Sequence, residues 1–203
     1  MLNQGSILGS TFFASREPVR NVMTLKLIKA CQDMGSQEPA LMGCLGYRLV
    51  RGFLLTTDGN LNTMREGDIV EVTDYDPVRK TSLVIGLREP SKFVPLHWLG
   101  LQTHPDKLVT LFLFIDPAPP GINIFSSKLL HGSFEEAMEV AKVLKASKKD
   151  AIFIDGGGLF MVSKNLETLA KDFKDLLESA QTEPAPKTKA AAKKKKAPSK
   201  DRA

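Results

Sequence analysis

Histidine side chains are the first residues of this sequence that could carry chemistry. His97 and His104 are seven residues apart, so a helix places them near one face, and Asp106 follows closely. Two imidazoles and a carboxylate could hold a divalent cation such as zinc. The plainer interpretation, which we favour, makes His97 a hydrogen-bonded packing residue and His104 an exposed helix end. His131 stands just ahead of a predicted helix, and we interpret it as a loop residue.

A glycine run at Gly156–Gly158 is the second candidate, because it follows a predicted strand and could present backbone N–H groups to an anion. The GxGxxG pattern of dinucleotide-binding loops is missing from this run, and a second strand, not a helix, is predicted to follow it. A tight hairpin turn is therefore the favoured interpretation, with Asp155 as a turn residue beside it.

The positive charge of the chain is concentrated at its C-terminal end. The whole sequence carries a net charge of +5, whereas residues 181–203 hold seven Lys and one Arg against two acidic residues, a net +6, which leaves −1 for residues 1–180. The tail has no large apolar residue, so we expect it to be disordered. Its run Lys193, Lys194, Lys195, Lys196 could attract RNA, DNA or an acidic protein, or could serve only as a solubilising extension.

Composition favours a soluble protein of the cytoplasm. No apolar run approaches the roughly 18–20 residues that span a bilayer, so no membrane span is expected. The short apolar stretch Ile7–Ala14 lacks a preceding Lys or Arg, unlike a signal peptide, and residues 1–15 are expected to be flexible. Cys31 and Cys44 form no CxxC pair and are too few for a disulfide framework.

Periodicity predicts one α/β domain over residues 16–180. Apolar residues at helical spacing, with capping signals such as Ser133 and Glu136, predict helices over residues 18–34, 95–104, 133–148 and 165–179. Pro18 suits the start of the first helix and Gly35 its end. Alternating or continuous apolar runs predict strands over residues 41–45, 47–51, 53–56, 68–73, 81–87, 107–114, 151–154 and 159–163. This order indicates a mixed, largely antiparallel sheet with helices packed against it.

The segment Glu89–Phe114 resembles the class II aldolase/adducin family. Its members show Pro-Ser-Ser-Glu, a His four residues later, a short helix, an Arg-Pro-Asp-like turn and a strand ending His-x-His. The matching residues of this chain stand without a gap at Pro90, Ser91, His97, Pro105 and Asp106. Later segments of the family resemble Gly132–Leu144, Ala151–Leu159 and Asn165–Ser179, and Leu25–Val72 matches more loosely. The resemblance implies a three-layer α/β/α fold over roughly residues 18–180.

At the positions of the family's metal ligands, this chain departs from the pattern. The resemblance places two metal-binding His of the enzymes at Phe112 and Phe114, the third at Gly157 and the acid–base Glu at Phe93. A phenyl ring offers no lone pair to a metal, and glycine has no side chain. The chemistry of the family needs both a Lewis acid and a proton-transferring carboxylate. Rings at these positions fill the old cleft or line an apolar pocket.

The phosphate-binding segments of the family resemble Gly43–Tyr47 and Thr56–Gly59. Tyr47 falls near the family's Asn, and Asp58 falls near its phosphate-binding Ser, where a carboxylate would repel phosphate. The positions that the resemblance and the loop patterns nominate for ligand binding are Gly46, Thr57, Gly59, Ser91, Gly156 and Gly157.

The leading hypothesis is a non-catalytic relative of the family without a cofactor, a pseudoenzyme that acts as an oligomeric scaffold or binding module. The family's enzymes often form rings of four, which implies a homo-oligomer. One alternative is a divergent sugar-phosphate lyase (aldolase) or epimerase with a relocated active site, for which Glu89, His97 and Asp155 are the candidates and zinc the expected metal. Another is a nucleic-acid-binding protein that works through the Lys-rich tail.

Overall fold

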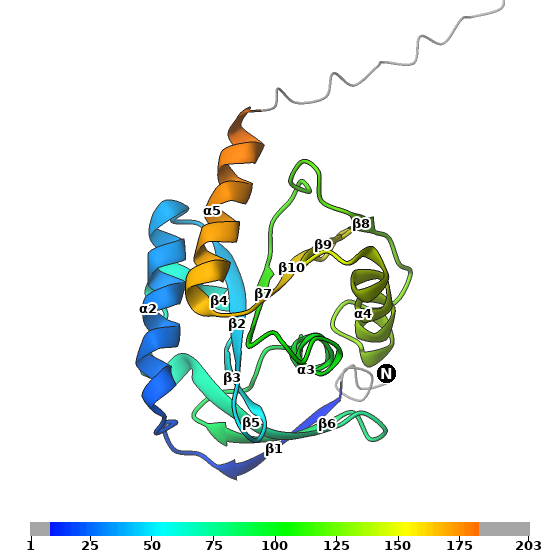
Figure 1. Ribbon diagram of the computed structural model, residues 1–203. Helices are drawn as coiled ribbons and strands as arrows, with labels where there is room; N and C mark the ends of the chain where they lie inside the picture. Colours follow the sequence, from blue (N-terminus) through cyan, green and yellow to red (C-terminus); the bar gives the residue numbers. More distant parts are fainter. Residues whose placement is uncertain (1–8, 183–203) are drawn as a thin grey trace, which may run out of the picture.

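A ten-stranded mixed sheet with helices on both faces makes up the protein. The computed structural model describes residues 9–182, and Figure 1 shows its three layers, with the sheet between two pairs of helices. The helices are α2 (Val22–Gln37), α3 (Val94–Thr103), α4 (Phe134–Ser147) and α5 (Leu166–Thr182), with short 3-10 turns at Leu61–Thr63 and Glu66–Asp68. The Lys-rich run 193–196 lies outside the described residues.

The strands follow one another mainly as antiparallel neighbours. They are β1 (Ser10–Ser15), β2 (Met42–Arg48), β3 (Phe53–Thr56), β4 (Gly59–Asn60), β5 (Ile69–Asp76), β6 (Thr81–Gly86), β7 (Val109–Leu113), β8 (Ile124–Phe125), β9 (Ala151–Ile154) and β10 (Gly158–Ser163). Their order is β1-β6-β5-β3-β2-β7-β10-β9-β8, with β4 paired to β2, and only β1·β6 and β8·β9 are parallel pairs among the described strands. The predicted mixed, largely antiparallel α/β architecture is confirmed.

The two faces of the sheet bury separate apolar cores. In β7 every side chain is buried, and Leu111 and Leu113 contribute to the core under α2 and α5, whereas Phe112 between them contributes to the core under α3 and α4. Alternation along a strand sends neighbours to opposite faces, so a strand buried on both faces reads as a continuous apolar run.

Some local predictions were wrong. Residues Ser10–Ser15, expected to be flexible, form β1 and pair with β6. The first helix begins after Asn21, whose side chain accepts a hydrogen bond from the Met23 N–H, because an Asn cap satisfies a free helical N–H group that Pro18 could not.

Gly35 does not end that helix either. It lies inside α2 against the backbone of Asn62, and a Cβ at Gly35 would come within 2.4 Å of the Asn62 nitrogen. This glycine therefore serves a close approach of two chain segments, not a helix stop. The strands predicted at 41–45 and 47–51 are likewise one strand, β2, which ends at Arg48.

None of the described helices combines the length and hydrophobicity that crossing a membrane requires. The domain limits at residues 16 and 180 stay a prediction.

We expect Leu27→Ala to lower the free energy of unfolding by about 3 to 5 kcal/mol, because it opens a cavity in the core under α2. Leu27 is fully buried there. Leu25→Ala, on the same helix but 64% exposed, is the matched control and should change stability by less than about 0.5 kcal/mol. Urea denaturation followed by circular dichroism measures both, and equal losses would contradict this packing of α2.

Candidate functional site

Three phenylalanine rings gather where the start of α3 meets β7. Phe112 and Phe114 are two residues apart, so both point to the α3 side of the sheet, and Phe93 directly precedes α3. The Phe93 and Phe112 rings stack with centroids 3.8 Å apart, and the Phe114 ring lies 5.7 Å from Phe93 and 5.2 Å from Phe112. Phe93 is 1% exposed and Phe112 is fully buried. We call these three residues the ring cluster.

The ring cluster fills the interior of its site but leaves an outer hollow. Phe114 is only partly buried and lines a cavity of about 300 Å³ together with Ile115, Asp116, Gly156 and Gly157. The inner rings therefore contribute packing and apolar burial, at about 1.5 to 3 kcal/mol for each buried ring. Both outcomes that the sequence left open are present, a filled interior and an apolar hollow outside it.

A chain of polar side chains runs beneath the ring cluster, centred on His97. The ring nitrogens of His97, which lies in α3, are 2.7 Å (Nδ1) from Oγ1 of Thr110 and 3.2 Å (Nε2) from Sγ of Cys44. The Cys44 thiol donates to Oγ of Ser91 (3.3 Å), which also accepts from the Phe93 N–H (3.0 Å). These four residues, His97, Thr110, Cys44 and Ser91, are all almost completely buried.

One arrangement of protons satisfies every hydrogen bond among these four side chains. Thr110 O–H donates to Nδ1, His97 Nε2–H donates to the sulfur, and the thiol S–H donates to Ser91. All four side chains are then uncharged, which suits a buried site.

Burial keeps the His97 imidazole and the Cys44 thiol uncharged. It lowers the pKa of His97 to about 3, and it raises the pKa of the Cys44 thiol well above its usual range, with the Asp58 carboxylate raising it further. A buried thiol of raised pKa is a poor nucleophile, so the Cys44–His97 pair is a structural contact.

Gly46 makes room for His97, and Gly100 makes room for the Phe160 ring that packs against His97. A Cβ at Gly46 in β2 would come within 2.5 Å of Oγ1 of Thr110 and 3.0 Å of Nδ1 of His97. A Cβ at Gly100 in α3 would come within 2.7 Å of the Phe160 ring, and that ring meets His97 edge-on. Gly46, nominated as a ligand-binding position, therefore lies against the imidazole.

Some of the other candidate residues lie near the hydrogen-bonded side chains around His97, and the rest lie away from them. Ser91 is one of the four hydrogen-bonded side chains around His97. The loop Thr57–Gly59 lies nearby, since the Asp58 carboxylate raises the pKa of Cys44. Glu89 is exposed, and so is Asp155, which accepts a hydrogen bond from the Ser126 hydroxyl (3.0 Å). Gly156 and Gly157 form the hairpin turn between β9 and β10, as the favoured interpretation predicted.

The pair His131 and Glu136 was missed from the sequence. Nδ1 of His131 lies 2.6 Å from Oε1 of Glu136, which is 2% exposed and whose Oε2 accepts from the Gly132 N–H (2.8 Å). The imidazole covers the hairpin turn, because a Cβ at Gly157 would lie 3.3 Å from Nδ1 of His131. The capping residues Ser133 and Glu136 were the only signal, since they place Glu136 in the first turn of α4.

Across residues 9–182, no three His, Cys, Asp or Glu side chains come together in a group that could hold a metal ion. His97 and His104 do not share a ligand position, because Nδ1 of His104 lies 3.1 Å from the Gly100 carbonyl oxygen and 3.0 Å from the Thr103 hydroxyl.

Solved structures of sugar-phosphate aldolases share this fold. An L-fuculose 1-phosphate aldolase matches with a TM-score of 0.64 and 17% identity, covering 80% of this chain and 85% of its own. The L-fuculose-1-phosphate aldolase of Thermus thermophilus matches with a TM-score of 0.60 and 19% identity, covering 78% of this chain and 91% of its own. The N-terminal class II aldolase domain of a conserved protein from Thermoplasma acidophilum matches with a TM-score of 0.54 and 13% identity, covering 81% of this chain and 95% of its own.

The chain therefore has the class II aldolase/adducin fold, as the resemblance implied. No family model matches the sequence, and no curated protein matches it. A shared fold at these identities does not assign an activity.

The free energy of unfolding should fall as the pH is lowered from 6.5 toward 3, with His97 contributing up to about 1.4 kcal/mol per pH unit. The pKa of His97 drops from 6.5 to about 3 on folding, so within this range the unfolded chain binds a proton that the native protein does not. Urea titrations at several pH values should give a shallower dependence for His97→Gln than for the unmodified protein. His104→Gln is the control and should keep the unmodified slope; parallel curves for His97→Gln would contradict the burial of a neutral imidazole.

Proposed function

We propose that this protein is a non-catalytic domain with the class II aldolase fold, which acts as a scaffold or binding module. One observation carries the proposal: the Phe93 ring stacks on Phe112 at 3.8 Å, both almost fully buried, where the resemblance places an acid–base carboxylate and a metal-binding imidazole. Aromatic rings in contact leave no space for a cation and supply no ligand to it.

The environment of the ring cluster supports the same proposal. Asp58 places a carboxylate beside Cys44, between two segments where the resemblance implies phosphate binding, and a like charge opposes a phosphate. The catalytic alternative finds little support, because His97 is buried in neutral hydrogen bonds whereas Glu89 and Asp155 are exposed on separate loops. We further propose a cytoplasmic location, in keeping with two buried, unpaired cysteines.

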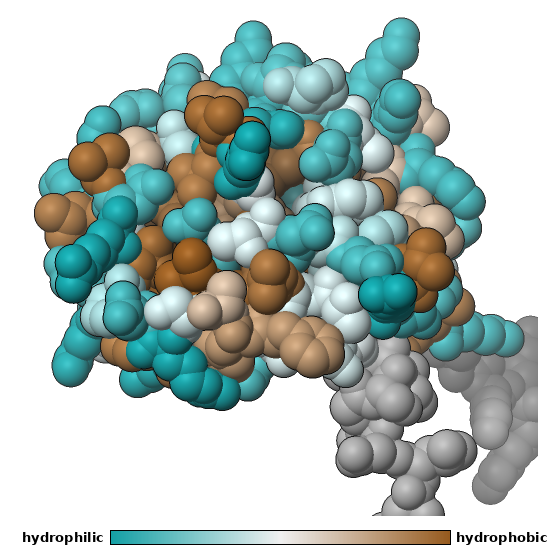
Figure 2. Space-filling model, turned by 90° about the horizontal axis from the view of Figure 1, so that it is seen from below, coloured by the Kyte–Doolittle hydropathy of each residue, from teal (hydrophilic) through white to brown (hydrophobic). Residues whose placement is uncertain are grey.

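A homo-oligomer is part of the proposal, and the β1 edge of the sheet is its proposed contact. Within the described chain β1 is the last strand on that edge, so its outer backbone groups face no neighbouring strand. Phe12 on β1 is 60% exposed and pairs in register with Leu83 on β6, which is 42% exposed. Figure 2 views the side of the molecule on which β1, β5 and β6 lie in Figure 1, and apolar side chains gather there among polar ones.

The Lys-rich tail is proposed to add contact with RNA, DNA or an acidic protein. Its net charge of +6 contrasts with the nearly neutral remainder of the chain, so attraction to a polyanion belongs to this segment. An oligomer would carry several tails and so strengthen such contacts.

Purified protein should retain neither zinc nor manganese in stoichiometric amount, because rings occupy the ligand positions. Elemental analysis by mass spectrometry measures this, with an L-fuculose 1-phosphate aldolase purified in the same buffers as the control. Added zinc should produce no cleavage of L-fuculose 1-phosphate. One metal ion per chain, or cleavage that depends on zinc, would refute the non-catalytic proposal.

Phe12→Asp should convert the oligomer to single chains, because it puts a charge into an apolar contact between sheet edges. Light scattering coupled to gel filtration gives the mass of each species. Val22→Asp, at an 87% exposed position at the start of α2, is the control and should leave the mass unchanged. A single-chain mass for the unmodified protein would remove the oligomer from the proposal.

A further inference from the structure

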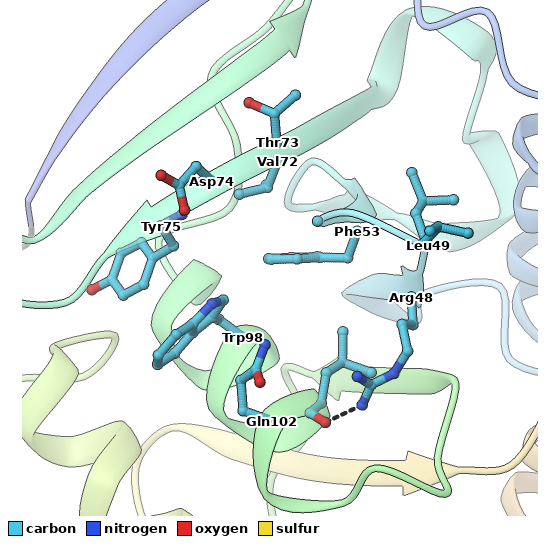
Figure 3. Close-up of a pocket in the computed structure, with 12 residues that line it drawn as sticks. Arg48, Leu49, Phe53, Val72, Thr73, Asp74, Tyr75, Trp98 and Gln102 are labelled. Carbon is cyan, nitrogen blue, oxygen red and sulfur yellow. Dashed lines mark hydrogen bonds between the residues drawn. The ribbon is translucent and has the colours of Figure 1, made fainter.

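A second cavity lies at the far end of α3 from the ring cluster and shares no residue with it. It has a volume of about 200 Å³ and opens between the C-terminal half of α3, the turn after β2 and the middle of β5. Figure 3 shows the side chains around it, among them Phe53, Asp74, Trp98 and Gln102. We call it the α3–β5 cavity.

Buried apolar side chains lie beneath the α3–β5 cavity. Phe53, Val72 and Leu101 line it, and each is at most 3% exposed because the rest of the side chain is packed in the core under α3 and α4. Trp98 packs against Tyr75, with ring centroids 5.4 Å apart, which fixes one wall. Because the apolar side chains beneath the cavity are almost fully covered, most of the surface that a bound molecule would meet is polar.

The rim of the cavity carries hydrogen-bonding groups that have no partner among the described residues. In Figure 3 the nitrogen edge of Trp98 and the amide of Gln102 face the open space below Phe53, and no described residue accepts from or donates to either group. Asp74 uses one carboxylate oxygen to accept from the Tyr75 N–H (2.9 Å), which leaves the other oxygen available. The rim thus offers two donors and two acceptors, counting both ends of the amide.

The formal charges of the lining cancel. Asp74 contributes one negative charge and Arg48 one positive charge. Arg48 is committed to the backbone, since its Nε donates to the Lys107 carbonyl (3.1 Å) and its Nη2 to the carbonyls of Leu101 and His104. The lining is therefore not specialised for a phosphate or for an ammonium group.

We propose that the α3–β5 cavity binds a neutral, ring-shaped polyol of the size of one monosaccharide. A hydroxyl group both donates and accepts, so neighbouring hydroxyls can give to Asp74 and receive from Trp98 or Gln102. The hydroxyl groups of such a ring match the largely polar lining, its C–H face can lie over the few apolar atoms that remain exposed, and a volume of about 200 Å³ holds a single ring. This site is independent of the ring cluster and of the proposed scaffold role.

Trp98 provides a direct test, because it is the only tryptophan of the chain and lines the cavity. The probes are the methyl glycosides of glucose, galactose and mannose, together with myo-inositol. At least one should produce a saturable change in tryptophan fluorescence, with a Kd on the order of 1 mM, as befits a small neutral ligand. Saturation-transfer NMR on the same probe should show its C–H protons in contact with the protein.

Two substitutions should each weaken that binding by roughly tenfold or more, because each removes a rim group: Gln102→Ala and Asp74→Asn. Both side chains are exposed, so the fold should tolerate the changes. Gln37→Ala and Asp106→Asn are matched controls at exposed positions outside the cavity and should bind as the unmodified protein does.

Three results would overturn the assignment. The first is the lack of a saturable change for all four probes up to about 50 mM, far above the expected Kd. The second is binding that Gln102→Ala and Asp74→Asn both leave intact. The third is tighter binding of inorganic phosphate or of choline than of any polyol, which would show that the cavity selects charge.

Discussion

The stack of Phe93 on Phe112 is the contact on which the architecture of this side of the molecule depends. It joins the residue that begins α3 to the centre of β7, a strand buried on both faces. With the helix start fixed there, His97 one turn later meets Thr110 on the same strand and Cys44 on the neighbouring strand β2. The stacked rings and the uncharged hydrogen-bonded side chains beneath them form one buried layer between α3 and the sheet.

The ring cluster lies in a fold that solved aldolases share. A shared fold leaves the activity to individual side chains, so the proposed non-catalytic role rests on a few residues. The imidazole of His131, held by Glu136, covers the turn at the position where a side chain on residue 157 would stand. In the proposed role, this covered turn and the stacked rings occupy the positions where the resemblance places metal ligands.

Much of this fold could be predicted from the sequence because its signals are local. The continuous apolar run before Phe114 indicated β7, and the spacing of Ser133 and Glu136 indicated the start of α4, where the Ser133 hydroxyl accepts from the Glu136 N–H. The order of elements then sufficed to suggest the fold class. Both signals act within one strand or one helical turn.

The missed features come from contacts between distant segments. Gly35 resembled a helix end in the sequence, yet it lies inside a helix against Asn62. Cys44 was not predicted to be a partner of His97, since 53 residues separate them in the sequence. No periodicity encodes such pairs, because they exist only after the sheet has assembled.

Arg48 anchors the C-terminal end of helix α3 through contacts that the ten residues of the helix do not make on their own. The ring stack lies at its first turn, and the guanidinium group of Arg48 donates to the carbonyl oxygens of Leu101 and His104 at its C-terminal end, so the helix is held at both ends. Trp98 and Gln102 therefore project from a helix whose two ends are anchored to the sheet and to Arg48. A ligand of the α3–β5 cavity would then need to order only exposed side chains such as Gln102 and Asp74, and the position of the helix would already be set.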